Sequence, residues 1–176
     1  FDFKAGQFAL FLILNEKFSG KHGKAYTITS LPGEDFLAIT VKRAGEFSNA
    51  LCDLKIGDKV KITGPFGNFY PAESDTDDIV FLAGGIGITP FYAVIKDFYK
   101  RKINRKIILI FSNRNKKDVI FFEELGELSE KWENLKIVHI LTREKEMISD
   151  IDEYKRMDAG MIKKYLGDLG KKDYLI

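Results

Sequence analysis

Cysteine, histidine and proline are scarce in this sequence. Its 176 residues include one cysteine, Cys52, two histidines and four prolines. One thiol cannot form an internal disulfide, a four-cysteine zinc site or a four-cysteine iron–sulfur site, and two histidines far apart in the chain add no metal site. We therefore expect no metal centre and a reducing, cytoplasmic location. His139, within an apolar stretch, is expected to be a core or edge histidine whose hydrogen bonds are satisfied.

Long apolar runs and an excess charge of one sign are also missing. The longest apolar run, Phe8 to Leu14, has seven residues, whereas a membrane-spanning helix needs about 18. The 28 Lys and Arg residues against 26 Asp and Glu residues give +2, without the strong basic excess of nucleic-acid binders. Hydrophobic residues at 45% and charged residues at 31% indicate a globular chain. The sequence predicts neither a transmembrane segment nor a nucleic-acid partner.

The first part of the chain resembles a series of short strands joined by turns. Alternating or apolar segments predict strands over residues 8–14, 25–29, 36–42 and 59–63. Pairs such as Pro32-Gly33 and Gly64-Pro65 are turn signals between them. Ser48 is a suitable N-cap for a short helix over residues 48–54. Short strands at this spacing favour a small antiparallel barrel.

The second part alternates strands and helices. Apolar runs predict strands over residues 79–83, 107–111, 135–141 and 173–176. Helical spacing predicts helices over residues 90–100, around 121–128 and over 161–169. A strand–helix series of this kind favours a parallel sheet with helices on its faces. The acidic stretch 72–78 fits a boundary, so we expect one domain over residues 1–74 and another over residues 75–176. Ile176 ends the sequence inside an apparent strand, so we expect a fragment of a longer protein.

A glycine-rich turn joins the first predicted parallel strand to the following helix. The segment Ala83 to Pro90 reads AGGIGITP, with Thr89 as a suitable N-cap and Pro90 as a suitable first helical residue. Glycines let backbone N–H groups approach a phosphate, and the helix N-terminus adds partial positive charge there. The strict G-x-G-x-x-G fingerprint is absent, because Pro90 occupies the third glycine position. A tight strand–helix turn without a ligand is the alternative.

Two segments of the first part carry groups suited to a flat, phosphorylated cofactor. In the segment Lys24 to Ser30, KAYTITS, a tyrosine can stack on a heterocycle, a hydroxyl can donate to a ring nitrogen, and a lysine can pair with a phosphate. Alternation places Tyr26 and Ile28 on one face of the strand and Thr27 on the other. The segment Gly45 to Ser48 leads into the short helix and can hold an anion. The alternative is a half-exposed strand and an ordinary capped helix.

Taken together, these segments resemble the ferredoxin–NADP reductase superfamily. The order and spacing of the segments 24–30, 45–48, 64–69 (GPFGNF) and 84–90, with 110–114 (IFSNR) after them, carry the resemblance over nearly the whole chain. The resemblance implies a Greek-key flavin-binding barrel followed by a nicotinamide-nucleotide domain with a five-stranded parallel sheet. It also implies a first barrel strand before Phe1 and a Cys-Gly-Pro segment after Ile176.

The same resemblance implies the functional residues. Tyr26 would lie against the flavin ring and Thr27 would reach its reactive N5 edge, so these two are the catalytic candidates. Lys24 stands where the family usually has an arginine that binds the flavin phosphate, and Gly45 to Ser48 would hold a pyrophosphate, which favours FAD over FMN. The flavin-binding candidates are Lys24, Tyr26, Thr27, Ile28, Thr29, Val41, Lys42, Gly45, Phe47 and Ser48. The nucleotide-binding candidates are Gly84, Gly85, Gly87, Thr89, Pro90, Ser112, Arg114, Thr142 and Arg143.

The function implied is a flavin-dependent NAD(P)H reductase. Hydride would pass from nicotinamide to FAD, and electrons would pass on to a redox partner of unknown identity: ferredoxin, another iron–sulfur protein, a haem protein, an oxygenase component or free flavin. Thr142-Arg143-Glu144 resembles a stretch that contacts the 2′-phosphate in NADP-using members, which slightly favours NADPH over NADH. The alternative is a non-catalytic module that binds flavin or nucleotide within a larger electron-transfer complex.

Overall fold

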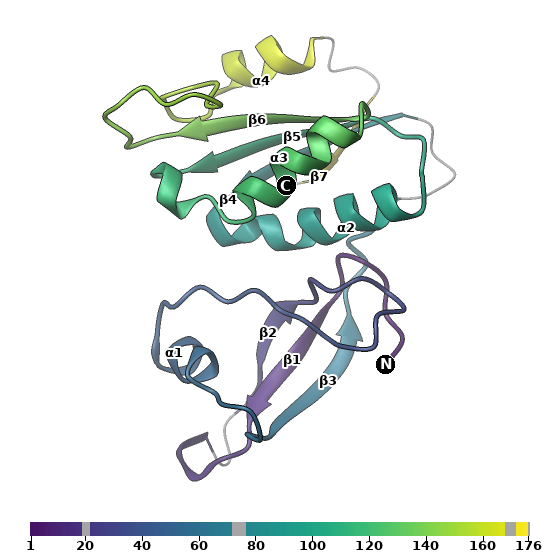
Figure 1. Ribbon diagram of the computed structural model, residues 1–176, viewed down its shortest axis with the longest axis vertical. Helices are drawn as coiled ribbons and strands as arrows, with labels where there is room; N and C mark the ends of the chain where they lie inside the picture. The colour runs from purple at the N-terminus through teal and green to yellow at the C-terminus, as the bar shows by residue number, and fades with distance from the viewer. Residues whose placement is uncertain (19–21, 72–76, 168–171, 176) are drawn as a thin grey trace.

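Two sheets of different kinds make up the chain (Figure 1). The computed structural model describes residues 1–18, 22–71, 77–167 and 172–175. The first sheet is antiparallel with the strand order β2-β1-β3, and consists of β1 (Phe8–Ile13), β2 (Lys24–Thr27) and β3 (Val60–Phe66). The second is parallel with the order β6-β5-β4-β7, and consists of β4 (Asp78–Gly84), β5 (Ile107–Asn113), β6 (Leu135–Leu141) and β7 (Lys172–Leu175). The predicted fold class, an antiparallel barrel followed by a parallel α/β unit, is confirmed.

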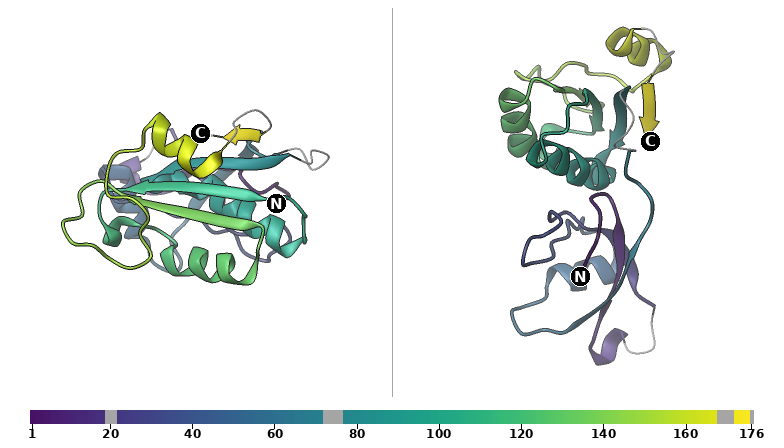
Figure 2. Two further views of the ribbon diagram at one scale, coloured as in Figure 1. Left: turned by 90° about the horizontal axis from the view of Figure 1, so that it is seen from above. Right: turned by 90° about the vertical axis from the view of Figure 1, so that its right-hand side faces the viewer.

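Helices cover both faces of the parallel sheet (Figures 1 and 2). Helices α2 (Thr89–Lys100) and α3 (Phe122–Lys131) lie on one face, and α4 (Ala159–Leu166) lies on the other. The first unit contains α1 (Glu46–Cys52). The described residues also include three 3-10 turns: η1 (Glu16–Phe18), η2 (Gly85–Ile88) and η3 (Lys116–Asp118). Alternate residues of β4 enter two different cores, Ile79 and Phe81 beneath α2 and Val80 beneath α4. This is why residues 79–83 of β4 are all apolar.

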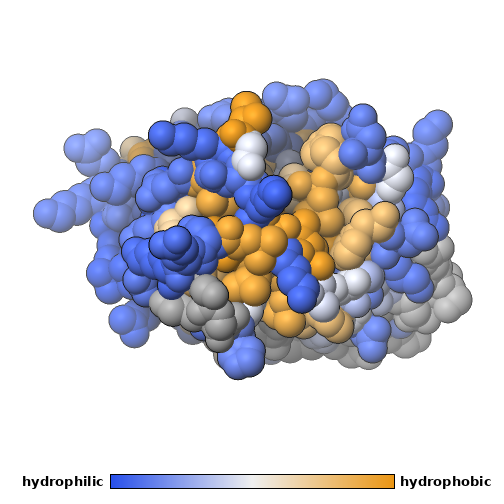
Figure 3. All heavy atoms as spheres, turned by 90° about the horizontal axis from the view of Figure 1, so that it is seen from below, coloured by the Kyte–Doolittle hydropathy of each residue, from blue (hydrophilic) through white to orange (hydrophobic). Residues whose placement is uncertain are grey.

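The antiparallel sheet has a small core and an apolar hollow. Ala9, Phe11 and Ile28 are buried together at its centre. Beside them lies a hollow of about 470 Å³, lined by Phe11, Ile39, Val41, Leu51, Cys52, Val60 and Ile62. Seen from below, the molecule shows apolar side chains gathered on this face (Figure 3). The hollow lies between α1 and the sheet, so α1 covers this core only partly.

Aromatic side chains join the two units where the chain passes from one to the other. The rings of Phe69 and Phe91 meet edge to face at 5.0 Å between centroids. The Tyr70 hydroxyl donates to a carboxylate oxygen of Asp97 in α2 at 2.6 Å, and the Tyr70 ring packs edge-on against Phe98. Helix α2 is therefore packed between its own sheet and the end of the antiparallel unit.

The strand predicted over residues 36–42 is wrong. This segment makes one isolated bridge, from Ile39 to Ile28, and has no regular ladder. The Ser30 hydroxyl accepts the N–H of Ala38 at 3.1 Å, so a side chain takes a donor that a neighbouring strand would use. Side-chain oxygens of this kind compete with the backbone ladder. Strand β2 also ends at Thr27, two residues before the predicted end.

Helix α1 begins two residues before its predicted start at Ser48, α2 begins one residue before its predicted start at Pro90, and α4 begins two residues before its predicted start at Met161. Gly45, not Ser48, is the N-cap of α1, and Ser48 is its third helical residue. Helix α2 begins at Thr89, with η2 immediately before it, so Thr89 is not the N-cap. Because η2 continues into α2, the first helical turn of this unit begins within the glycine segment itself.

Several predicted features fall outside the described residues. The predicted domain boundary between Ser74 and Asp75 lies there, as do Leu169 and Ile176 at the predicted ends of a helix and a strand. The resemblance implied five parallel strands, and four occur in the described ranges. No helix within these ranges is both long enough and apolar enough to cross a membrane.

Candidate functional site

The glycine turn forms an open cradle at the end of β4. Gly85 has φ of +51°, which favours glycine over residues with a side chain. A Cβ atom at Gly85 or Gly87 would meet no other atom within 4 Å, so the space in front of the turn is free. The N–H groups of a first helical turn are orphan donors with partial positive charge. The cradle therefore has the room and the electrostatics for a phosphate group.

Thr89 and Pro90 support this cradle from behind. Thr89 is buried, and its hydroxyl donates to the Ile86 carbonyl at 3.2 Å. Pro90 occupies an early helical position, where the N–H that it lacks would have no helical acceptor. Both residues thus shape the turn.

The register of the parallel sheet brings the other nucleotide candidates to the same edge. Ser112 of β5 lies opposite Gly84 of β4. The Asn113 carbonyl accepts the Thr142 N–H at 3.0 Å and the Thr142 hydroxyl at 3.2 Å. Ligands of open parallel sheets bind at the carboxyl ends of the strands, where these residues lie.

Two arginines flank this edge. The Arg143 N–H donates to the Arg114 carbonyl at 2.9 Å, which holds the segments after β5 and β6 together. A Glu144 carboxylate oxygen accepts the Lys116 N–H at 3.1 Å and ties the same two segments a second time. Both arginines are exposed, so their guanidinium groups are available to an anion.

Two buried polar side chains differ from what the sequence predicts: Asn113 was not a candidate, and the surroundings of His139 are not those expected. The Asn113 side chain is 5% exposed, and neither atom of its amide has a hydrogen-bond partner among the described residues. Only its place beside Ser112 could have marked it in the sequence. His139 is 7% exposed, and its Nδ1 likewise has no such partner. The expectation of a satisfied histidine was therefore wrong.

On the antiparallel unit, Tyr26 and Thr27 end an edge strand. The Tyr26 ring meets Phe11 edge-on at 6.0 Å and lies nearly parallel to Phe47. Burial, and to a smaller extent the nearby Cys52, raise the pKa of Tyr26 above its ordinary value of 10.0, so the phenol stays neutral at physiological pH. Thr27 is half-buried and pairs with Phe8. Tyr26 pairs with the buried Ala9 and lies on the core face of the sheet, so the Thr27 hydroxyl, which comes next along the strand, lies on the other face.

The remaining flavin candidates lie in three different settings. Lys24 and Lys42 are exposed, and Lys24 begins β2. Ile28 and Thr29 point their side chains into the unit, and the Thr29 hydroxyl lies 3.3 Å from that of Thr40. Val41 lines the apolar hollow. Lys24 is therefore an exposed cation two residues before Tyr26, while Ile28 and Thr29 are buried and support the strand.

The Gly45–Ser48 turn is organised by one hydroxyl. Ser48 Oγ accepts the N–H groups of Ala44 at 2.9 Å and Gly45 at 3.0 Å, and donates to the Gly45 carbonyl at 3.0 Å. The space around Gly45 is open. Ser48 thus holds the backbone of this turn in place, and the N–H groups of the first helical turn are the donors left for an anion.

Comparison with known proteins agrees with this geometry. Residues 81–176 match the family model of the oxidoreductase NAD-binding domain, and residues 1–70 match that of the oxidoreductase FAD-binding domain. The chain belongs to the ferredoxin–NADP reductase superfamily. The two matched domains assign FAD and a nicotinamide dinucleotide as the cofactors of this superfamily member. The open glycine cradle suits the phosphates of the nicotinamide dinucleotide, and the strand end at Tyr26 and Thr27 suits the flavin ring of FAD.

Relatives of this superfamily member include reductase components of oxygenases. The reductase subunit of glycine betaine monooxygenase from Pseudomonas aeruginosa is 34% identical over 80% of this chain and 39% of its own length. The ferredoxin reductase component of 3-ketosteroid-9-alpha-monooxygenase from Rhodococcus rhodochrous is 36% identical over 80% of this chain and 41% of its own length. The chain thus spans about two-fifths of the length of these relatives.

Solved structures show the same fold. The FAD/NAD-binding domain of nitric oxide dioxygenase from Vibrio cholerae superposes with a TM-score of 0.83, at 19% identity over 99% of this chain and 73% of that one. A ferredoxin NADP+ reductase from Neisseria gonorrhoeae with bound FAD and NADP gives a TM-score of 0.71, at 26% identity over 89% of this chain and 63% of that one.

Proposed function

We propose that this chain is the cofactor-binding part of a flavin-dependent NAD(P)H oxidoreductase. The observation that carries the proposal is the open cradle at Gly85 and Gly87. The register of the sheet brings Ser112 opposite Gly84, and Thr142 lies at the same end of the sheet, bonded to Asn113. Residues 1–74 would form the flavin domain and residues 75–176 the nucleotide domain, which is supported by the change from antiparallel to parallel pairing between β3 and β4.

The protein's part in this reaction is binding and orientation. When bound, FAD supplies the redox chemistry between the nicotinamide and the final acceptor. Tyr26 offers its neutral ring face, and Thr27, the next residue of the strand, offers a hydroxyl donor at the strand end. Lys24 neutralises a phosphate as a point charge, because an ammonium lacks the bidentate fork of an arginine. No side chain has to act as a general acid or base in this scheme.

We propose NADPH as the preferred donor. The exposed guanidinium groups of Arg114 and Arg143 belong to adjacent segments that are tied by a 2.9 Å backbone hydrogen bond. Two cations beside one edge favour the additional phosphate of NADPH, because guanidinium–phosphate pairs are strong and directional.

The electron acceptor is proposed to be a redox protein. The two relatives named above are a reductase subunit and a ferredoxin reductase component of monooxygenases, which supports an iron–sulfur or oxygenase partner. The single cysteine, Cys52, means that the chain itself offers no ligand set for an iron–sulfur cluster.

The deciding experiment is anaerobic visible spectroscopy of the complete, flavin-loaded protein, before and after adding NADPH or NADH. Bleaching of the flavin band is expected, faster with NADPH. Thr27→Ala should retain flavin and slow the bleaching at least tenfold, as expected for a lost hydrogen bond in a water-poor site. A flavin-loaded protein that neither nucleotide bleaches would instead favour the non-catalytic binding module.

A further inference from the structure

A pocket of about 410 Å³ lies between helices α2 and α3, which run side by side on one face of the parallel sheet (Figure 1). Its lining side chains recur every three or four residues, from Tyr92 to Lys100 in α2 and from Glu124 to Lys131 in α3, so each helix presents one face to it. The buried Leu31, from the loop after β2, lines it from the first unit. None of its described lining residues is a flavin or nucleotide candidate.

Tyr92 brings an unused hydroxyl to this pocket. Its side chain is 8% exposed, and its ring is stacked on that of Phe121 with 3.7 Å between the centroids. Within the described ranges the hydroxyl makes no hydrogen bond. Polar groups of buried residues are almost always hydrogen-bonded, and the hydroxyl of a buried tyrosine usually finds a partner. The Tyr92 hydroxyl is therefore available to a ligand.

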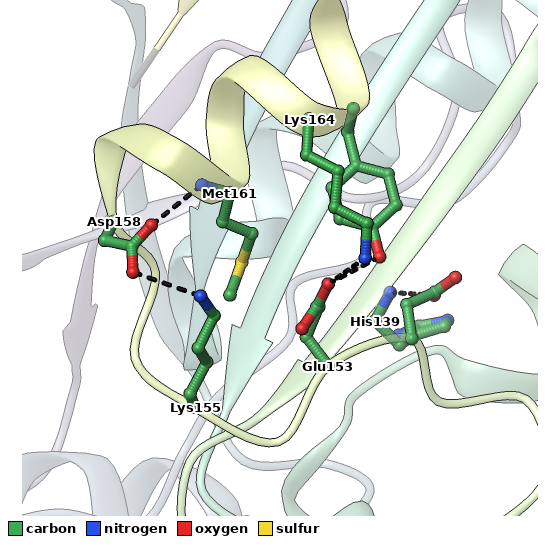
Figure 4. Close-up of polar contacts among 8 residues, drawn as sticks. His139, Glu153, Lys155, Asp158, Met161 and Lys164 are labelled. Carbon is green, nitrogen blue, oxygen red and sulfur yellow. Dashed lines mark hydrogen bonds and ion pairs between the residues drawn. The ribbon is translucent and has the colours of Figure 1, made fainter.

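The other unpaired polar groups lack this access. The amide of Asn113 and the Nδ1 atom of His139 are enclosed. The His139 N–H donates to an Asp152 carboxylate oxygen at 2.8 Å across from α3 (Figure 4), and the His139 ring lies 4.9 Å from that of Phe122. A ligand could reach these atoms only by displacing side chains. The Tyr92 hydroxyl is not among the enclosed atoms, and its side chain forms part of the pocket wall.

Cations outnumber anions around the pocket. Glu127 and Lys131 neutralise each other in an ion pair of 2.9 Å. Lys96 and Lys100 then remain against Glu124, and neither lysine forms an ion pair in the part of the chain that the structure describes. The remaining charge of the wall is positive by one, which favours a ligand with a single negative charge.

Two hydrogen-bond donors lie near one another on α2. The Lys96 ammonium lies 5.2 Å from the centre of the Tyr92 ring. Burial, followed by the charges of Glu124 and Glu34, raises the pKa of Tyr92 to about 12, so its phenol stays a donor at physiological pH. A carboxylate has two acceptor oxygens and can take one donor on each. An ammonium beside a neutral phenol therefore suits a carboxylate.

The rest of the wall is aliphatic or aromatic, with Leu31, Leu128 and Tyr99. Aromatic ligands gain from contact with tyrosine rings beyond the area that they bury, and the volume lies within the usual range of small-molecule sites, about 300–1,000 Å³. We propose that this pocket binds an aromatic monocarboxylate, with its ring between α2 and α3 and its carboxylate at Tyr92 and Lys96. The site is separate from the flavin and nucleotide sites and does not rest on the proposed function.

The test is calorimetric titration of the complete protein with 2-naphthoate, in the presence of excess FAD and NADP+ so that both cofactor sites are filled. We expect one saturable site. Tyr92→Phe keeps the ring stack and should bind about tenfold more weakly, because a hydrogen bond to a charged group is lost. Lys96→Met should bind roughly two- to fivefold more weakly. The matched control is Lys136→Met, whose ammonium also lies over a tyrosine ring, that of Tyr165, outside the pocket, and it should stay within about twofold of the native affinity.

A neutral ligand of the same shape separates charge from apolar contact. We expect 2-naphthylmethanol to bind at least about tenfold more weakly than 2-naphthoate, because it lacks the carboxylate. Four results would overturn the proposal: no saturable binding, native affinity in Tyr92→Phe, equal losses in Lys96→Met and Lys136→Met, or equal affinity for the acid and the alcohol. Because the titration measures binding without turnover, such a failure is distinct from a failure of the proposed reductase function.

Discussion

The phenol ring of Tyr26 lies almost parallel to the ring of Phe47, at an interplanar angle of 18° and a centroid separation of 6.5 Å. Tyr26 belongs to an edge strand and Phe47 to helix α1. Phe47 also meets Phe18 edge to face at 5.2 Å. Helix α1 thus fixes the Tyr26 ring through aromatic contacts.

The first prediction concerns this contact. Phe47→Ala should weaken FAD binding roughly two- to tenfold, because an aromatic pair contributes about 0.5–1.5 kcal/mol and here orients Tyr26. Tyr26→Ala should weaken it further, whereas Tyr26→Phe, which keeps the ring, should bind like the native chain. The quenching of FAD fluorescence on titration measures all three. Equal FAD affinity in the native chain and Tyr26→Ala would contradict the assignment of the flavin site.

The glycine cradle supplies the second prediction. Gly85→Val should weaken binding of either nicotinamide nucleotide at least tenfold, because the side chain fills the open space and a φ of +51° costs about 1–2 kcal/mol for a residue with a Cβ. Gly126→Ala, at an open position within α3, is the matched control and should bind normally. Fluorescence titration with NADPH distinguishes the two, and comparable losses would count against the cradle.

The third prediction separates the two nucleotides. Arg143→Ala should weaken NADPH binding about tenfold, since a hydrogen bond to a charged group contributes about 1.5–3 kcal/mol, and should leave NADH binding within about twofold. Arg114→Ala should act in the same direction. Arg156→Ala, at another exposed position, serves as the control. If Arg143→Ala lowers both affinities equally, the arginine holds a group that the two nucleotides share.

A fourth prediction concerns the junction of the two units. The Tyr70 hydroxyl donates to Asp97 and accepts from Arg101 at 2.8 Å. Tyr70→Phe removes this hydroxyl and leaves the nearly buried Asp97 carboxylate with one donor fewer, so the free energy of unfolding should fall by about 1–3 kcal/mol. Urea denaturation measures the loss, and Tyr99→Phe, on the exposed side of α2, should change little. If Tyr70→Phe unfolds at the same urea concentration as the native chain, the Tyr70 hydroxyl does not contribute to stability.

The fifth prediction is a pH dependence. Burial holds the pKa of His139 below its ordinary value of 6.5, so the unfolded chain binds this proton more readily than the folded one. The contribution of His139 to stability is therefore present above about pH 6.5 and is lost as the pH falls from there toward the folded pKa. His139→Gln should flatten the decline of the melting temperature in that window. If the melting temperature falls equally in the native chain and in His139→Gln, the pH dependence comes from other groups.

Some features follow from local sequence alone. The apolar run of β4 predicts a strand buried on both faces, and the glycines after it predict a turn open to a phosphate. Both features can be read from the sequence because each is set by a few consecutive residues. Strands β4, β5 and β6 lie where periodicity places them. The start of α2 was misplaced, because η2 runs into it without a break and the Thr89 hydroxyl bonds to Ile86 rather than to the helix N-terminus.

The sequence by itself determined the class of the fold, the order of its segments and the type of cofactor they suit, since periodicity, turn residues and glycine placement act over a few residues. Only the tertiary structure decided that residues 36–42 form no strand, because the Ser30 hydroxyl takes a backbone donor eight residues away. It also decided that Gly84, Ser112 and Thr142 share one edge, and that Asp152 faces the carboxylates of α3. Strand register and backbone pairing between distant segments set these contacts, and no local pattern encodes them.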